Sequence, residues 1–371
     1  MTFLLYFSLF YAFMIFCLII GILRCFRSGG EASEQKNFIS VIIACKNEES
    51  NIINLIKSLK NQTYHKDHYE VIFADDGSTD STADIIKQNI KDVRNFHYLY
   101  VEQNAYPDLR GKKKAISYAI EHSFTNKEKI LAFTDADCTP EKDWLWDINQ
   151  AFINGCDFYA GYSPIHFEKS NIFTNLKNIE RASIFAVSAA GFGLGIPLTC
   201  TARNMAYKSS IWIKSEGFLG IGHILSGDDD LMLHKARHFI DKYHFSFHPN
   251  AFVTSFNENK LNNQIAHETR RASKFIHYPP HIKLLIVFVT IFYLFLLYQI
   301  VVSVITLSIP FDLTIAIASK ILLEFTLLSI FLMKVNKLNL MKSFFLAELF
   351  YIPYFLFFGI KGTLGKYKWK N

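Results

Sequence analysis

The chain has 371 residues, half of them hydrophobic, and a formal net charge of +6. That length allows one sizeable globular domain together with several membrane segments. The modest positive charge suits a protein beside an anionic membrane surface and does not indicate nucleic-acid binding. The six cysteines are scattered and form no CxxC pair, which argues against a disulfide framework or a zinc site and favours a reducing compartment.

Residues 1–27 predict an N-terminal membrane anchor. The run is apolar until Arg24, and about 20 apolar residues span a bilayer core. A cleavable signal peptide is the alternative, but no basic region precedes the run and no small-residue cleavage site follows it. Arg24 and Arg27 come directly after it, so the positive-inside rule puts the next part of the chain in the cytoplasm. We therefore expect an integral protein of the cytoplasmic membrane whose globular domain faces the cytoplasm.

Residues 38–276 predict one globular α/β domain in which strands and helices alternate. Strands are expected at 38–44, 69–74, 97–102 and 130–133, and helices at 49–61, 82–88 and 112–122. This alternation indicates a mainly parallel sheet, whose ligands bind beyond the carboxyl ends of the strands. Thr139-Pro140-Glu141 is typical of a helix start.

Polar segments follow three of these strands directly, at 45–49, 75–80 and 135–137. Asp135 and Asp137 are two residues apart on extended backbone, so their side chains point the same way. Two close carboxylates repel each other unless a cation or a proton intervenes. Hard oxygen ligands suit Mg²⁺ or Mn²⁺, which also bind substrate phosphates. The segment therefore predicts a divalent metal site.

Taken together and in their order along the chain, these polar segments resemble those of family-2 glycosyltransferases, which have a Rossmann-like GT-A fold. The resemblance extends from Ser40 to Lys274. The resemblance implies that Asp135 and Asp137 hold the metal on the diphosphate of a nucleotide-sugar donor. It also implies a set of donor-binding residues, namely Ala44, Asn47, Glu48, Asp75, Asp76, Gly111, Lys112 and Asp135. Lys113 and Lys114 are interpreted instead as solvated charges that open a helix.

The acids at 228–230 resemble the family's Glu-Asp-x-Asp-Leu element, and alignment on Leu231 puts the catalytic base at Asp228. Gly227 replaces the usual Glu, which leaves Asp229 open as the alternative base. Asp230 is expected on the acceptor side. The segment with Arg203 and Asn204 resembles the family's acceptor-side segment, and the alternative is an ordinary strand with polar edge groups.

The segment 267–274 lies where membrane synthases carry Gln-x-x-Arg-Trp, and only Arg270 matches. By the resemblance, Arg270 reaches the donor phosphates and His267 lies on the acceptor side. Arg271 and Lys274 are interpreted as contacts to anionic lipid headgroups. The loss of the full element argues against a processive polysaccharide synthase, which remains the alternative enzyme.

Residues 281–371 predict a C-terminal membrane region of two to three helices, formed from apolar runs at 284–309, 314–333 and 343–360. The last run is expected to be re-entrant or interfacial, because the basic tail after it favours the cytoplasm. Lys320 and Glu324 are spaced i, i+4, and form either a polar patch near a lipid or a pair that only fixes packing. Segments 171–190 and 264–276 are amphipathic and either lie at the interface or pack on the domain.

The resemblance implies inverting, metal-dependent transfer of a sugar from a nucleotide-sugar, expected to be a UDP-sugar. The acceptor is expected to be a lipid-linked molecule or glycan near the membrane, in cell-envelope glycan or glycolipid synthesis, with membrane lipids as further partners. A non-catalytic scaffold that binds nucleotide-sugar is the other alternative. The acids at 135, 137 and 228 argue against it.

Overall fold

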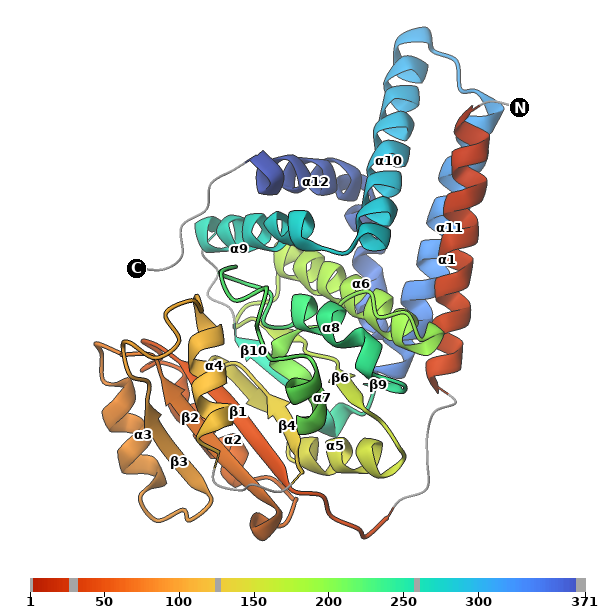
Figure 1. The fold of residues 1–371 in the computed structure, drawn as a ribbon. Coiled ribbons are helices and arrows are strands. Elements are labelled where there is room, and N and C mark those ends of the chain that lie inside the picture. Colours follow the sequence, from red (N-terminus) through yellow and green to blue (C-terminus); the bar gives the residue numbers. More distant parts are fainter. Residues whose placement is uncertain (1–2, 27–32, 124–127, 257–260, 365–371) are drawn as a thin grey trace. The chain divides into compact units, whose positions relative to one another are not determined.

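The computed structural model describes residues 3–26, 33–123, 128–256 and 261–364, and its chain forms two compact units (Figure 1). The membrane unit comprises residues 1–24, 169–194 and 258–371, and the sheet unit comprises residues 25–168 and 195–257. The expected single domain at 38–276 is thus divided. Residues 169–194 and the segment from 258 onward pack with the terminal helices instead of with the sheet.

A seven-stranded sheet forms the centre of the described part of the sheet unit, in the order β3-β2-β1-β4-β8-β6-β9. Only β8 runs antiparallel to its neighbours β4 and β6 within this described sheet, which confirms the mainly parallel α/β fold. The strands are β1 (Ile39–Cys45), β2 (Tyr69–Asp75), β3 (Phe96–Tyr100), β4 (Ile130–Phe133), β6 (Phe158–Gly161), β8 (Met205–Lys208) and β9 (Tyr243–Ser246).

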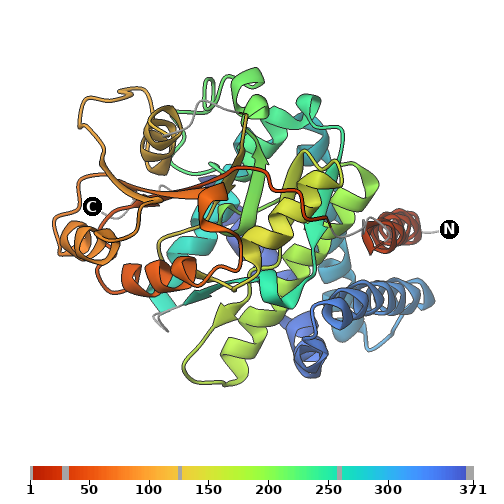
Figure 2. The same ribbon diagram turned by 90° about the horizontal axis from the view of Figure 1, so that it is seen from below.

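Helices cover both faces of this sheet because alternate strand residues point to opposite sides. Ile39, Val41 and Ile43 of β1 join a core with α2 (Ile52–Lys60), α3 (Thr82–Ile90) and α5 (Trp144–Ile153). The expected apolar face of α2 is confirmed, since its Ile and Leu side chains are buried. Helix α4 (Lys112–Glu121) contacts β1 and β2 on the other side of the sheet (Figure 2).

A small second sheet in the sheet unit corrects the expected helix start at Thr139-Pro140. Its order is β5 (Cys138–Pro140), β10 (Val253–Phe256) and β7 (Ile165–His166). Thr139 pairs antiparallel with Thr254, and Pro140 pairs with Val253 on the edge strand, where a missing N–H costs no ladder bond. The next helix begins only at Trp144. The Pro signal marked a strand end and not a helix start.

Short helices complete the sheet unit. They are η2 (Lys66–His68), η3 (Ala202–Asn204), α7 (Ser209–Lys214), α8 (Asp230–Ala236), η4 (Arg237–Phe239) and η5 (Pro249–Ala251).

The membrane unit consists of helices in its described residues. They are α1 (Phe3–Cys25), α6 (Ile172–Leu194), α9 (Leu261–Ser273), η6 (Lys274–His277), α10 (Pro280–Thr306), α11 (Phe311–Lys334), η7 (Leu338–Ser343) and α12 (Phe344–Leu364). Among the described residues, four helical segments are long and apolar enough to cross a membrane: α1, α10, α11 and the segment Leu338–Thr363 that contains α12. These flanking helices confirm the expected apolar segments at both ends of the chain.

Helix α12 differs from the other three apolar helices in its direction. It contains Pro353, and its labelled part runs across the direction of α10 beside α9 (Figure 1). A helix that runs across the direction of α10 is what we expect of a last segment that does not cross the bilayer. That this segment does not cross stays a prediction. Lys366, Lys368 and Lys370 of the basic tail lie outside the described residues.

Charged side chains join α6 to α9 within the membrane unit. The Nη2 atom of Arg271 lies 2.6 Å from an oxygen of Glu180 and 3.0 Å from an oxygen of Glu268. The expectation that Arg271 rests on lipid headgroups is therefore wrong, because two carboxylates already bind its guanidinium. Lys274 is buried, so its expected headgroup contact is wrong as well.

Candidate active site

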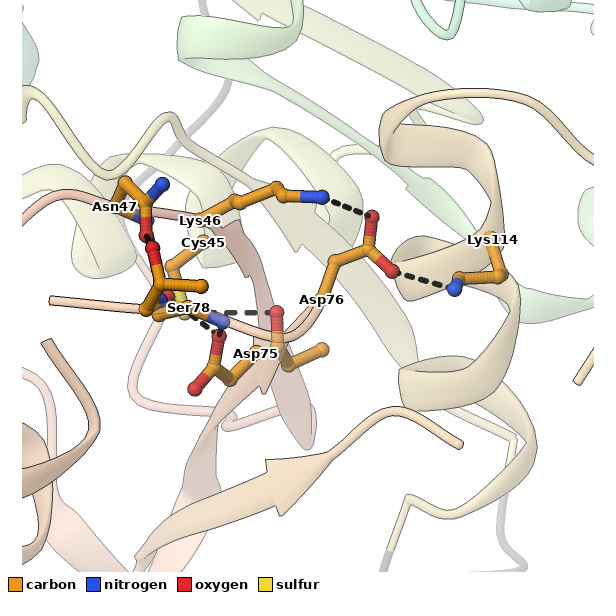
Figure 3. A network of polar contacts seen from close by, with 9 residues as sticks. Cys45, Lys46, Asn47, Asp75, Asp76, Ser78 and Lys114 are labelled. Carbon is orange, nitrogen blue, oxygen red and sulfur yellow. Dashed lines mark hydrogen bonds and ion pairs between the residues drawn. The ribbon is translucent and has the colours of Figure 1, made fainter. Parts of the chain in front are cut away.

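The loops that follow β1 and β2 are fastened to each other (Figure 3). The backbone N–H of Asn47 donates to the hydroxyl of Ser78 at 3.0 Å, and the side-chain oxygen of Asn47 accepts from the N–H of Thr79 at 2.8 Å. Asn47 has a φ of 55°, a left-handed conformation that Asn adopts more readily than most residues. The expected donor-binding residue Asn47 thus fixes the shape of the loops through its own side chain.

Asp75 is buried at the end of β2, where it lies beside Ser78 (Figure 3), and both of its oxygens are used inside the protein. One oxygen accepts from the N–H of Ser78 at 2.9 Å and from its hydroxyl at 2.6 Å, and the other accepts from the hydroxyl of Tyr98 at 2.9 Å. The structure therefore gives Asp75 a positioning role in the loop, and its expected contact with the donor stays a prediction.

The next acid, Asp76, is partly exposed and lies between two lysines (Figure 3). Its carboxylate is 2.6 Å from Nζ of Lys114 and 3.9 Å from Nζ of Lys46. The interpretation of Lys114 as a solvated charge is wrong, because Asp76 pairs with it. Ala44 is only partly buried at the end of β1, and the N–H of Glu48 donates to the hydroxyl of Thr82 at 2.8 Å. These residues border the same pair of loops.

Asp135 follows β4 and is held by two cations. Nζ of Lys112 donates to one of its oxygens at 2.8 Å, and Nε of Arg203 lies 3.5 Å from the other. Burial alone would raise the pKa of Asp135, but Lys112 and then Arg203 outweigh it, so the pKa lies below its ordinary value. Asp135 is therefore ionised at neutral pH.

Lys112 lies among three of the predicted acids. Burial alone would lower its pKa, but the charges of Asp135, Asp228 and Asp137, in that order of size, raise it. Lys112 therefore keeps its positive charge. The charges of residues 135, 137 and 228, which come from distant parts of the chain, all act on this one ammonium group within the sheet unit.

Asp135, Asp137 and Cys138 have ligand atoms within 4.8 Å of one another, close enough to hold one metal ion. Burial and then Asp137 raise the pKa of the Cys138 thiol, so the sulfur stays protonated and is a poor ligand. The two carboxylates remain, which suits Mg²⁺ or Mn²⁺. Because Lys112 and Arg203 engage Asp135, Asp137 is the more available ligand.

The three acids at 228–230 have different surroundings. Asp229 precedes α8 and its carboxylate accepts from the N–H of Asp230 at 2.8 Å. Asp230 is buried, and its carboxylate accepts from the N–H of Leu231 at 2.9 Å. The expected acceptor contact by Asp230 is therefore not supported by an exposed carboxylate. Both acids serve the start of the helix, as negative charges at an N-terminus do.

Asp228 accepts no hydrogen bond from any group in the described part of the chain. Burial, followed by the charge of Asp229, raises its pKa above the ordinary value. Gly227 before it has a φ of +84°, and a Cβ there would lie 2.4 Å from Cδ1 of Leu231. No Glu fits at this position, so the glycine is required by the turn that presents Asp228.

Lys113 is the residue that the sequence interpretation missed. It is 1% exposed, and its ammonium group donates to the carbonyls of Ile224 at 2.6 Å and Ser226 at 2.7 Å. Gly111, with a φ of +59°, lets α4 approach the same segment, since a Cβ would lie 2.9 Å from the carbonyl oxygen of Leu225. Helix α4 thus holds the loop that leads to Asp228. The signal was present, because Lys113 lies three residues before buried Ile116 on the helix.

Of the other predicted residues, Asn204 lies in the core of the sheet unit. Asn204 is fully buried, and its amide is engaged by the indole N–H of Trp144 at 2.9 Å and by two backbone carbonyls. The expectation that it contacts an acceptor is corrected, because it bonds the core instead. Arg270 belongs to the membrane unit, and the side chain of His267 lies outside the described residues.

Comparison with known proteins gives a family for the region that carries these loops. Residues 40–214 match the family model described as glycosyl transferase family 2. The glycosyltransferase AglE of Haloferax volcanii is 28% identical over 204 residues, which cover 52% of this chain and 59% of that protein.

A second relative, from Methanococcus voltae, is a dolichyl N-acetyl-alpha-D-glucosaminyl phosphate 3-beta-D-2,3-diacetamido-2,3-dideoxy-beta-D-glucuronosyltransferase. It is 34% identical over 109 residues, which cover 29% of this chain and 32% of that protein. The chain thus spans about a third to three fifths of the length of these relatives. Among solved structures, the mannosyltransferase PcManGT from Pyrobaculum calidifontis, in complex with GDP-Man and Mn²⁺, has a TM-score of 0.49 at 16% identity, covering 94% of this chain and 98% of that one.

Proposed function

Because residues 40–214 belong to glycosyl transferase family 2, we propose that this chain transfers a sugar from a nucleotide-sugar to an acceptor at the membrane. The observation that carries the proposal is the cluster of Asp135, Asp137 and Asp228 around Lys112. Carboxylates beside a fixed cation and a metal site suit a diphosphate-bearing donor, and an acid that accepts no hydrogen bond from the described residues suits a base.

Asp228 acts as the general base in this proposal. It takes the proton from the acceptor hydroxyl as that oxygen attacks the anomeric carbon, and a positioned base typically supplies about 10²- to 10⁴-fold. Asp229 was the alternative, but its carboxylate already accepts from the N–H of Asp230. Attack from the side opposite the leaving group inverts the anomeric centre.

The leaving diphosphate is met by positive charge held at Asp135. Lys112 and Arg203 are both fixed there, so they need no rearrangement to face the developing negative charge. Asp137, with Asp135, would hold a Mg²⁺ or Mn²⁺ ion, which supplies further charge stabilisation on the diphosphate oxygens when bound. The loops bordered by Ala44, Asn47, Glu48 and Asp76 would take the nucleoside, and a UDP-sugar is the expected donor.

A lipid-linked acceptor is supported by the apolar helices and by the dolichyl-phosphate-linked substrate in the name of the Methanococcus relative. Arg24 in the last turn of α1 favours a sheet unit that faces the cytoplasm. In that orientation the chain would act in cell-envelope glycan or glycolipid synthesis at the cytoplasmic membrane.

The test is transfer by the full-length protein in detergent, with a panel of UDP- and GDP-sugars and a membrane lipid extract as acceptor. Nucleotide release and the mass of the product lipid are measured with Mg²⁺, with Mn²⁺ and with EDTA. We expect one donor to give a lipid heavier by a single sugar, in a reaction that EDTA stops. Products with many sugars would instead favour a processive synthase, and donor binding without transfer would favour a scaffold. Transfer that persists in EDTA would refute the metal assignment.

A further inference from the structure

Lys320 and Glu324 belong to a larger buried cluster in the membrane unit. Their i, i+4 spacing predicts either a polar patch near a lipid or a pair that only fixes packing. Nζ of Lys320 donates to Glu324 at 3.1 Å and also contacts the carboxylate of Glu348 on α12. The hydroxyl of Tyr11 on α1 donates to the other oxygen of Glu324 at 2.5 Å. One ammonium group therefore serves two carboxylates, and the pair does fix helix packing.

The same cluster also faces a cavity, which packing alone does not require. The cavity has a volume of about 250 Å³ and is lined by α1, α6, α10, α11 and α12, all within the membrane unit. Of its twenty lining residues only four are charged, namely Lys177, Glu180, Glu324 and Glu348. The remaining wall is largely aliphatic and aromatic. Concave, mainly apolar sites with a few polar groups are where small ligands bind, and an apolar cavity of this size accepts hydrocarbon.

The charges around the cavity select against an anionic ligand. Lys177 lies 3.0 Å from Glu268 and 3.8 Å from Glu180, and the guanidinium of Arg271 binds the same two carboxylates. Among the residues that line the cavity, three carboxylates therefore stand against one ammonium group. The cations beyond the lining, Lys320, Arg271 and Arg181, already act on these or neighbouring carboxylates. A phosphate would meet an excess of like charge, whereas a hydroxyl group donates to a carboxylate.

We propose that this cavity binds a hydrocarbon chain of a membrane lipid whose polar end is uncharged and carries a hydroxyl group. The chain lies against the apolar wall formed by α6, α11 and α12, and the hydroxyl donates to Glu324 or Glu348. Of the five lining helices, α1, α10, α11 and α12 belong to the described segments that are long and apolar enough to meet the bilayer, which makes lipid the ligand at hand. The binding is independent of sugar transfer, so it stands whether or not this lipid is the acceptor.

The experiment uses the full-length protein in nanodiscs without any sugar donor. The probes are a diacylglycerol with a photoreactive acyl chain and a phosphatidic acid with the same chains. We expect crosslinks on α6, α11 or α12, and stronger labelling by the uncharged diacylglycerol. Equal or stronger labelling by phosphatidic acid would overturn the proposed headgroup preference, and labelling confined to other helices would overturn the site.

Two variants sharpen this result. Ala347→Trp places a large side chain into the lining and should lower diacylglycerol labelling about tenfold. Leu349→Trp is the matched control, because Leu349 lies two residues away on α12, is 69% exposed and does not line the cavity. Equal labelling of both variants would contradict the site.

If Ala347→Trp fails to fold, as thermal unfolding would reveal, Glu324→Gln keeps the proposal testable. It preserves side-chain size and removes one carboxylate charge. Labelling by phosphatidic acid should rise relative to diacylglycerol, and an unchanged ratio would count against the electrostatic selection.

Discussion

Each unit of the molecule contains a lysine surrounded by carboxylates, and the two clusters are satisfied differently. In the membrane unit, Lys320 binds both neighbouring acids, and Tyr11 bonds the remaining oxygen of Glu324. In the sheet unit, Lys112 binds Asp135 and leaves Asp228 without a hydrogen bond from any described residue. Polar groups among apolar helices must be satisfied within the protein. Asp228 is only partly buried, so its carboxylate is not under this constraint, and the proposed function gives it the role of base.

Removing the charge of Asp228 is the strongest test of this difference between the two lysine clusters. Asp228→Asn should lower kcat about 10²- to 10⁴-fold, because the amide cannot accept the acceptor's proton. The KM for the donor should change little. Steady-state nucleotide release with and without acceptor measures both. Asp229→Asn is the matched control, and its smaller effect should appear mainly in stability, since Asp229 accepts from the start of α8. A larger loss of kcat in Asp229→Asn would transfer the role of base to that residue.

Equivalent lysine substitutions should have opposite consequences in the two units. Lys320→Met leaves Glu324 and Glu348 facing each other in a buried site, and breaking a buried pair costs about 3–5 kcal/mol of unfolding free energy. Lys112→Met should lower kcat about 10²- to 10³-fold, as removal of a preorganised donor does, because the proposed function places Lys112 beside the leaving diphosphate. Its cost in stability should stay below about 1 kcal/mol, since Lys112 is partly exposed.

Thermal unfolding in detergent and turnover, measured on both lysine variants, test this contrast. A similar loss of stability in the two proteins would show that Lys112 is a structural residue like Lys320.

Lys113→Met tests the link between α4 and the loop that carries Asp228. It removes the partner of two buried carbonyls, those of Ile224 and Ser226, at a cost of about 1–3 kcal/mol. Turnover should fall as well, because the loop loses its anchor. Lys114→Met is the control, since that lysine pairs with Asp76 instead. Equal effects of the two variants on stability would contradict the anchoring role.

The sequence predicted what depends on local pattern. Strand β4 has the expected bounds, and Asp135 and Asp137 follow its carboxyl end, where ligands of such sheets bind. What it missed depends on contacts distant in sequence. Pro140 pairs with Val253, and the amide of Asn204 is used by Trp144. A polar residue that bonds the core looks the same in sequence as one that binds a substrate.

The charge assignments failed for a related reason. Lys113, Lys114 and Arg271 were interpreted as solvated or lipid-facing, because a run of basic residues has no visible partners in one dimension. In the structure each has a partner far along the chain, such as the carbonyl of Ser226 for Lys113 and Glu180 for Arg271. By contrast, the sequence already showed that Gly227 replaces the Glu of the family element. The positive φ of Gly227 explains the replacement.

The smallest expected effect is a shift in the pH profile of transfer, and it tests whether Lys112 and Asp228 share one electrostatic site. Burial raises the pKa of Asp228, and Lys112 partly offsets that rise. Because the base works only when ionised, kcat/KM should fall as the pH drops through this pKa. Lys112→Met removes the offset, so the acid limb should move to higher pH, whereas Lys114→Met should leave it in place. Profiles measured with saturating metal report the position of the limb independently of the overall loss in rate. If the acid limb stays fixed or moves to lower pH in Lys112→Met, the charge of Lys112 does not lower the pKa of Asp228.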